Sequence, residues 1–324
     1  MKKNLLLIST ALLPFLTNAQ VAINDIWYNL DEGAYQAEVT YKGDYASQYK
    51  EYHGSIIIPA IVIYEGVEYS VTSIGDQAFY DCEELIAITI PESVTCIGSW
   101  AFHNCSNLTA ITIPEGVTSI KEGTFDSCCR LSNITFPKNP LLTSIGYCAF
   151  YECSSLTSIT LPSSITNIEN CAFLFCCGLI DITIPKNSQL TSIGSSALAY
   201  CSSLTNITIP KGVTNIGSNT FRECSSLRDV YCYAETVPST DSNAFGMSDL
   251  EHLTLHVPSC TLEDYQTTAP WSRFGEIVHL TDEEMSVEQS IIKGQHEIYD
   301  LQGHRVTHPT KGVYIVNGHK MLIK

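Results

Sequence analysis

One pattern, repeated along the middle of the chain, constrains the fold more than any other feature of the sequence. A clear copy reads Ser73-Ile-Gly-Asp-Gln-Ala-Phe-Tyr-Asp-Cys82 and then Leu85-Ile-Ala-Ile-Thr-Ile-Pro91. Steps of 23, 23, 25, 23, 25 and 23 residues separate the leading isoleucines, which are Ile74, Ile97, Ile120, Ile145, Ile168, Ile193 and Ile216. A near-constant period of this length predicts a stack of equivalent supersecondary units.

Each unit is expected to contain a short β-strand and a tight turn. The stretch Leu-x-x-Ile-Thr-Ile-Pro alternates inward Ile with outward Thr, and Pro ends the strand because it cannot donate a ladder hydrogen bond. The stretch Ile-Gly-x-x-Ala-Phe-x-x-Cys places Phe and Cys three residues apart, on one face of a single helical or 3₁₀ turn. One strand per repeat then predicts parallel strands about 4.8 Å apart, stacked in a right-handed solenoid.

The combined pattern resembles that of the BspA-like bacterial leucine-rich repeat proteins, and it extends over residues 55–258. The resemblance implies a leucine-rich-repeat solenoid with one short parallel strand and one helical or 3₁₀ turn per repeat. It also implies a surface protein that adheres to host extracellular proteins or to other cells. Departures from the pattern are few. Leu198 replaces one Phe, Lys121 and Glu169 replace Gly, and a degenerate last unit carries Ser248 in place of Cys.

The remaining chain divides into four segments. Residues 1–19 combine the basic start Met1-Lys2-Lys3 with an apolar run and small residues before Ala19, which predicts a secretory signal cleaved after Ala19. Residues 20–54 are expected to form an N-terminal β cap and residues 259–284 a C-terminal cap and linker, because a solenoid must shield its end rungs. Residues 285–324 are expected to form a small β tail. Its last part resembles the end of a type IX secretion sorting domain, and the alternative is a further β cap without a sorting role.

Composition narrows the classes of partner. Acidic residues outnumber basic ones by 34 to 17, and the net charge of -17 repels phosphate backbones and anionic lipid surfaces. No apolar run after the signal is long enough to span a bilayer. We therefore expect a secreted or cell-surface protein without a membrane span after signal cleavage. Its expected partners are extracellular or host surface proteins, and nucleic acid is not among them.

The chain contains 14 Cys, but most of them follow the repeat. A zinc site would need C-x-x-C pairs or a recurring His, and neither is present, so we expect no metal and no cofactor. The thiols are instead expected to pack as small hydrophobic side chains. Cys148 and Cys171 form a second column, whose two members could be joined by a disulfide or remain free. The main column, here called the cysteine ladder, consists of Cys82, Cys105, Cys128, Cys153, Cys176, Cys201 and Cys224.

Aromatic residues recur on the turns beside the repeated Phe, at positions that the core does not require. Such residues are enriched where proteins contact each other, which predicts a partner-binding surface. The alternative is that they fill gaps between neighbouring repeats. We call this set the aromatic stripe; it comprises Trp100, Tyr147, Tyr151, Phe175 and Tyr200.

No catalytic motif accompanies these features. The sequence lacks G-x-S-x-G, G-x-x-x-x-G-K and G-x-G-x-x-G, and its carboxylates are scattered along the repeats. A stack of equivalent units offers an extended surface with few pockets, which favours binding over chemistry. The sequence therefore predicts a non-enzymatic protein that mediates protein–protein interaction or adhesion. The alternative is an extracellular structural scaffold without a specific ligand.

Overall fold

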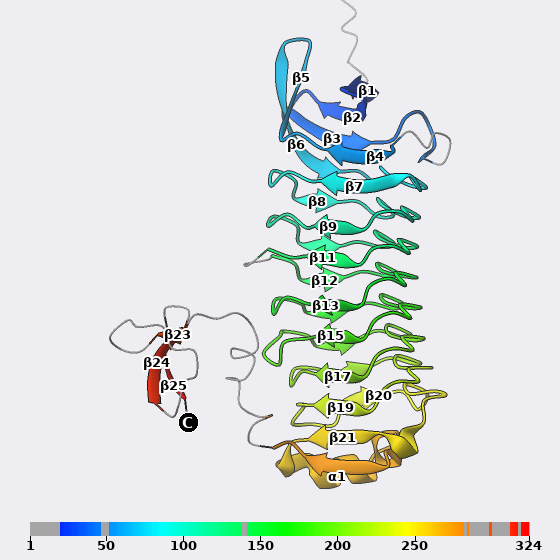
Figure 1. Ribbon diagram of the computed structural model, residues 1–324, viewed down its shortest axis with the longest axis vertical. Helices are drawn as coiled ribbons and strands as arrows, with labels where there is room; N and C mark the ends of the chain where they lie inside the picture. Colours follow the sequence, from blue (N-terminus) through cyan, green and yellow to red (C-terminus); the bar gives the residue numbers. More distant parts are fainter. Residues whose placement is uncertain are drawn as a thin grey trace, which may run out of the picture.

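The chain forms a long solenoid in which each repeat is one rung of the stack (Figure 1). The computed structural model describes residues 20–46, 52–137, 141–281 and 284, and the strand backbones at 298–299, 312–316 and 319–323. The predicted signal, residues 1–19, lies outside the described residues. Equivalent strands of successive repeats pair in parallel and in register, which confirms the predicted solenoid.

The strands predicted from the Ile-Thr-Ile pattern form the first wall of the solenoid. Ile134 pairs with Ile111 and Thr135 with Thr112, so chemically equivalent residues stack on each other. The inward Ile111 is buried and the outward Thr112 is exposed, as the alternation predicts. The wall consists of β7 (Leu85–Thr89), β9 (Ala110–Thr112), β11 (Asn133–Thr135), β13 (Ser158–Thr160), β15 (Asp181–Thr183), β17 (Asn206–Ile209), β19 (Asp229–Cys232), β21 (Thr254–Val257) and β22 (Glu276–His279).

A second wall corrects the expectation of one strand per repeat. The residue pair that ends in the leading Ile forms a two-residue parallel strand in the rungs from Ile97 to Ile216. A strand of two residues is too short to show an alternating pattern, which is why the sequence did not indicate it. The second wall contains β8 (Cys96–Ile97), β10 (Ser119–Ile120), β12 (Ser144–Ile145), β14 (Asn167–Ile168), β16 (Ser192–Ile193), β18 (Asn215–Ile216) and β20 (Ser239–Thr240).

A tight arc closes each rung from the residue after the leading Ile to the Cys. The arcs contain the i→i+3 hydrogen bonds of 3₁₀ turns, for example from Tyr80 N–H to the Gln77 carbonyl, but they are not helices. Gln77 and Asp81 both adopt φ of 59°, in the left-handed region, and this interrupts the helical path. Alternate amides therefore point to the next rung, where Gln77 donates to Ser99 and Asp81 donates to His103, both at 2.9 Å.

Aromatic rings form the centre of the core. The repeated Phe side chains stack with ring centroids 5.1 Å apart for Phe79 and Phe102 and 5.2 Å apart for Phe150 and Phe173. Leu198 occupies the same slot, fully buried, one rung after Phe173. Offset stacking at this spacing is a favourable geometry for aromatic pairs. The repeat period therefore places one ring above another at nearly the distance that ring stacking requires.

The cysteine ladder contributes hydrogen bonds as well as packing. The Cys105 thiol donates to the carbonyl of Phe79 in the preceding rung, with Sγ···O 3.1 Å, and Cys176 donates to Phe150 at 3.0 Å. In the degenerate last unit the Ser248 hydroxyl makes the equivalent bond. Each buried carbonyl thus gains a partner from the next rung, a role that the spacing of the cysteines in the sequence does not indicate.

The N-terminal strands continue both walls. β3 pairs in parallel with β6, β6 with β8, and β4 with β7. The Tyr52 ring lies 4.7 Å from that of Phe79 and extends the aromatic stack. These strands are β1 (Gln20–Ile23), β2 (Ile26–Asp31), β3 (Gln36–Thr40), β4 (Gly54–Ile57), β5 (Ile61–Tyr64) and β6 (Val67–Ile74).

At the other end of the stack, short helical segments pack against the last aromatic rings. Trp271 is fully buried and contacts Phe245, with ring centroids 5.6 Å apart, and Tyr265 at 5.5 Å. The segments are η2 (Leu250–His252), η3 (Ser259–Thr261), α1 (Leu262–Thr267) and η4 (Trp271–Arg273). Farther along the chain a separate antiparallel sheet consists of β23 (Ile298–Tyr299), β24 (Gly312–Val316) and β25 (His319–Ile323).

Candidate interaction surface

The aromatic stripe lies on the arcs, and four of its five residues belong to two ring clusters. In the first cluster His103 stacks on Tyr80, with ring centroids 4.5 Å apart, and Trp100 packs edge-on at 5.4 Å. In the second, Phe175 contacts Tyr151 edge-on at 5.7 Å and stacks with Tyr200 at 4.6 Å. The structure thus brings three of the five predicted residues together.

Exposure differs along the stripe. Tyr147 is 43% exposed and Phe175 is 37% exposed, so both present ring surface to solvent. Trp100, Tyr151 and Tyr200 are half-buried. Tyr147 also donates its backbone amide to the Glu169 carboxylate at 3.1 Å, which ties it to the next rung.

Three residues of the stripe occupy left-handed backbone positions. Trp100 has φ of 58°, Phe175 of 62° and Tyr200 of 60°. At the positions equivalent to Phe175 and Tyr200, other rungs carry residues such as Asp81 and Asn104, and short polar residues of this type adopt this conformation more easily. A bulky residue in the left-handed backbone region destabilises the folded chain by on the order of 1–2 kcal/mol. Packing between rungs does not require an aromatic residue at the positions of Phe175 and Tyr200, because the equivalent residues of other rungs are not aromatic.

Gly123 makes room for the Trp100 ring. It lies one rung further on, in the position equivalent to Trp100, and it too is left-handed, with φ of 58°. A Cβ atom at Gly123 would lie 2.3 Å from Cε3 of Trp100. The ring therefore covers the backbone of the next rung, and only Gly fits below it.

Carboxylates surround the stripe. Asp126 Oδ1 lies 3.6 Å from His103 Nδ1 and accepts a hydrogen bond from the Ser127 hydroxyl at 2.7 Å. Desolvation, followed by the charges of Asp81 and Asp126, raises the pKa of Tyr80. Desolvation, followed by the charges of Glu152 and Asp126, raises the pKa of Tyr151. Carboxylates are therefore the charged groups that act on Tyr80 and Tyr151.

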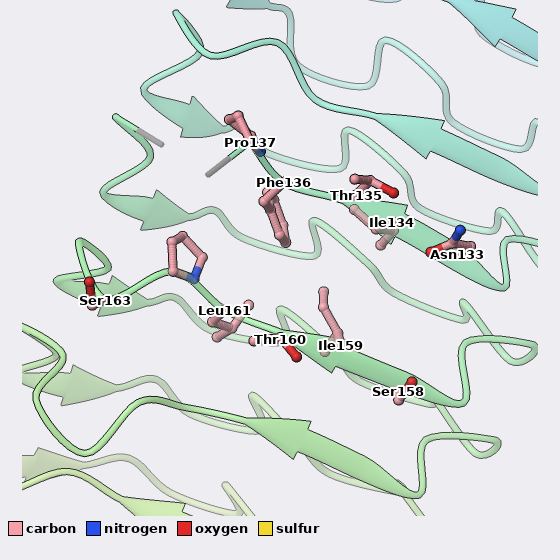
Figure 2. A pocket seen from close by; sticks show the side chains of 11 residues that line it. Asn133, Ile134, Thr135, Phe136, Pro137, Ser158, Ile159, Thr160, Leu161 and Ser163 are labelled. Carbon is pink, nitrogen blue, oxygen red and sulfur yellow. The ribbon is translucent and has the colours of Figure 1, made fainter. Parts of the chain in front are cut away.

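Two hollows lie away from the stripe. The first wall is interrupted between β11 and β13, where the described residues contain no backbone hydrogen bond between the two strands. Figure 2 shows the resulting groove, of about 430 Å³, with Ile134, Phe136 and Ile159 between the strands. A second cavity, of about 640 Å³, is lined by Lys186, Tyr233 and His279, among others. Within the described part of the chain no cluster of His, Cys, Asp or Glu could hold a metal ion.

The cysteines of the described chain are all free thiols. Cys148 and Cys171, for which a disulfide was one of two expectations, are not bonded to each other. Burial is the main cause that raises the pKa of Cys148, to about 11, and that of Cys224 in the ladder, to about 12. Thiols with raised pKa values are poor nucleophiles at neutral pH, because the thiolate is the reactive form.

These features define the class of the protein as a leucine-rich repeat solenoid with an exposed aromatic and acidic surface on its arcs. The family model of the BspA type leucine-rich repeat region matches residues 64–176 and 143–266 of the chain. The chain therefore belongs to the BspA-type leucine-rich repeat family, whose members are typically protein-interaction or surface proteins. Leucine-rich repeats are a non-enzymatic fold. Among the described residues, no helix is long and apolar enough to cross a membrane.

The chain is similar to several solved structures of bacterial proteins. A leucine-rich repeat protein from Bacteroides ovatus is 25% identical, with 80% of this chain and 76% of that chain covered and a TM-score of 0.42. A leucine-rich cell surface protein from Faecalibacterium prausnitzii is 21% identical, with 83% of this chain and 98% of that chain covered and a TM-score of 0.37. The pneumococcal vaccine antigen PcpA is 16% identical, with 82% of this chain and 99% of that chain covered and a TM-score of 0.37. The search of curated proteins found no match.

Proposed function

We propose that the protein is a secreted or cell-surface adhesion protein that binds extracellular proteins of a host or of other cells. Support comes from the family, whose members are typically interaction or surface proteins, and from the absence of a catalytic motif in the sequence. The proposed contact surface is the aromatic stripe. Rigid aromatic side chains are the residues that most often dominate the binding energy of protein interfaces.

One observation carries this proposal. Trp100, Phe175 and Tyr200 are aromatic residues in left-handed backbone positions, where the equivalent residues of the other rungs are not aromatic. Strained residues of this kind persist where function or the surrounding structure demands them. Filling gaps between rungs explains the half-buried Trp100, but it does not explain Phe175, whose ring remains 37% exposed.

Export is part of the same proposal. Residues 1–19 would direct secretion and be removed after Ala19, and residues 285–324 would act as a type IX sorting signal. The first segment lies outside the described residues, and of the second only β23, β24 and β25 are described. Intact mass spectrometry of the exported protein measures both cleavages. A mature chain that still contains residues 1–19 would refute the signal assignment.

The binding proposal is tested by capture on immobilised extracellular matrix and cell-surface proteins. The stripe variant Tyr147→Ala/Phe175→Ala removes the two most exposed rings of the stripe. The control variant Tyr45→Ala/Ile180→Ala removes two apolar side chains that are 72% and 50% exposed and lie off the stripe. We expect saturable binding that the stripe variant loses and the control retains. The absence of binding at micromolar protein would instead favour a structural scaffold without a specific ligand.

A further inference from the structure

The charges on the arcs indicate the chemistry of the partner. From the residue after each leading Ile to the following Cys, the seven arcs contain seven carboxylates and only two basic side chains, Lys121 and Arg222. The chain as a whole has 34 acidic and 17 basic residues, so the arcs are more acidic than the average of the molecule. A surface of this sign attracts cationic groups and repels anionic ones.

Aromatic rings and carboxylates alternate within this surface. Asp126 lies one rung after His103, at 3.6 Å from its ring nitrogen, and one rung before Tyr151. Glu122 and Glu152 are the further acidic neighbours of the stripe, and their charges contribute to the raised pKa values of Tyr147 and Tyr151 respectively. The pKa of Tyr147 is raised chiefly by its hydrogen bond with the Cys148 thiol.

Both features favour the same class of ligand group. The face of an aromatic ring attracts a cation through its quadrupole, and Arg guanidinium also stacks on such rings. A nearby carboxylate adds a charge-assisted hydrogen bond to the same cation. Neutral apolar surfaces would gain nothing from the carboxylates, and acidic surfaces would be repelled by them.

We infer that the aromatic stripe, together with Glu122 and Glu152, binds partner segments rich in Arg and Lys. This inference rests on the proposed binding function and specifies the chemistry of the partner. The exposed rings of Tyr147 and Phe175 receive the cationic side chains. The carboxylates on the same arcs orient these side chains and raise the rate of encounter.

The test uses the full mature chain and four immobilised peptides of equal length: nona-arginine, nona-lysine, nona-glutamate and a neutral Gly-Ser peptide. We expect binding to the two basic peptides and none to the other two. Because two exposed cation–π contacts correspond to about a five- to thirtyfold change in Kd, Tyr147→Ala/Phe175→Ala should weaken nona-arginine binding by that factor. This variant changes no charge, so its effect separates the stripe from the diffuse acidity of the chain.

Charge variants complete the test. Glu122→Gln/Glu152→Gln should weaken nona-arginine binding at least as strongly as the aromatic variant does. The control Glu115→Gln/Glu251→Gln makes the same change in net charge at exposed positions off the arcs, and it should leave Kd within about twofold of the wild type. Equal effects of the two charge variants, or unchanged binding by the aromatic variant, would overturn the inference. Loss of protein capture by the aromatic variant, combined with no preference for basic peptides, would overturn this inference and leave the proposed function intact. Capture unaffected by the aromatic variant would overturn the proposed function.

Discussion

Replacing Phe150 by Leu measures how much ring stacking stabilises the solenoid. Phe150 has no exposed surface, and its ring centroid lies 5.4 Å from that of Phe125 and 5.2 Å from that of Phe173. Leu keeps the slot apolar and nearly filled, as the natural Leu198 does two rungs later. The substitution therefore removes mainly two ring pairs. At about 0.5–1.5 kcal/mol per pair, the free energy of unfolding should fall by about 1–3 kcal/mol.

Urea unfolding followed by circular dichroism, with linear extrapolation to water, measures this loss. The reciprocal variant Leu198→Phe is the matched control, because it supplies a ring between Phe173 and Phe221. If the slots are equivalent, it should stabilise the chain by up to a similar amount. An unchanged stability for Phe150→Leu, together with a loss above about 1 kcal/mol for Leu198→Phe from overpacking, would refute the equivalence of the rungs.

Three further predictions concern the thiols and the arcs. At pH 8, iodoacetamide should modify the exposed Cys177 and Cys260, while the cysteine ladder should react only after unfolding. Peptide mass spectrometry identifies the modified residues. Ready modification of Cys153 in the native chain would contradict its burial. Burial raises the folded-state pKa of Cys224 to about 12, above its usual value of 9.0, so the unfolded chain ionises first and stability should fall as pH rises from about 9 towards 12. Constant stability over this range in urea titrations would exclude the effect. Gly123→Ala should lower the free energy of unfolding by about 1–3 kcal/mol and change the Trp fluorescence, because the new Cβ would overlap the ring of Trp100. A variant with wild-type stability and a wild-type spectrum would show that the ring does not lie over Gly123.

Periodicity made the fold predictable from the sequence. The leading Ile and the Cys recur with the same steps, so one correct interpretation of one unit applies to all of them. The inward Ile and outward Thr of β9, for example, follow directly from alternation. Departures such as Leu198 and Ser248 did not mislead, because neighbouring rungs determine the register.

Other features lacked a sequence signal. The strands of the second wall are only two residues long, and the thiol bonds join Cys to a backbone carbonyl one rung away, as from Cys105 to Phe79. The left-handed positions carry Asp, Asn, Ser, Glu and aromatic residues, so no single residue type marks them. The aromatic column was visible in the sequence, but the position of Asp126 between its two ring clusters emerged only from the stacking of rungs.

The central claim is that the aromatic stripe binds an extracellular protein, and an affinity measurement tests it most directly. A partner captured by the mature chain is titrated against the wild type, Tyr147→Ala/Phe175→Ala and the control Tyr45→Ala/Ile180→Ala, with matched unfolding curves for all three. Because interface residues that matter contribute more than about 1 kcal/mol each, the loss of two of them should raise Kd by about thirtyfold or more. The control should match the wild type. Equal affinity of all three chains would contradict the account.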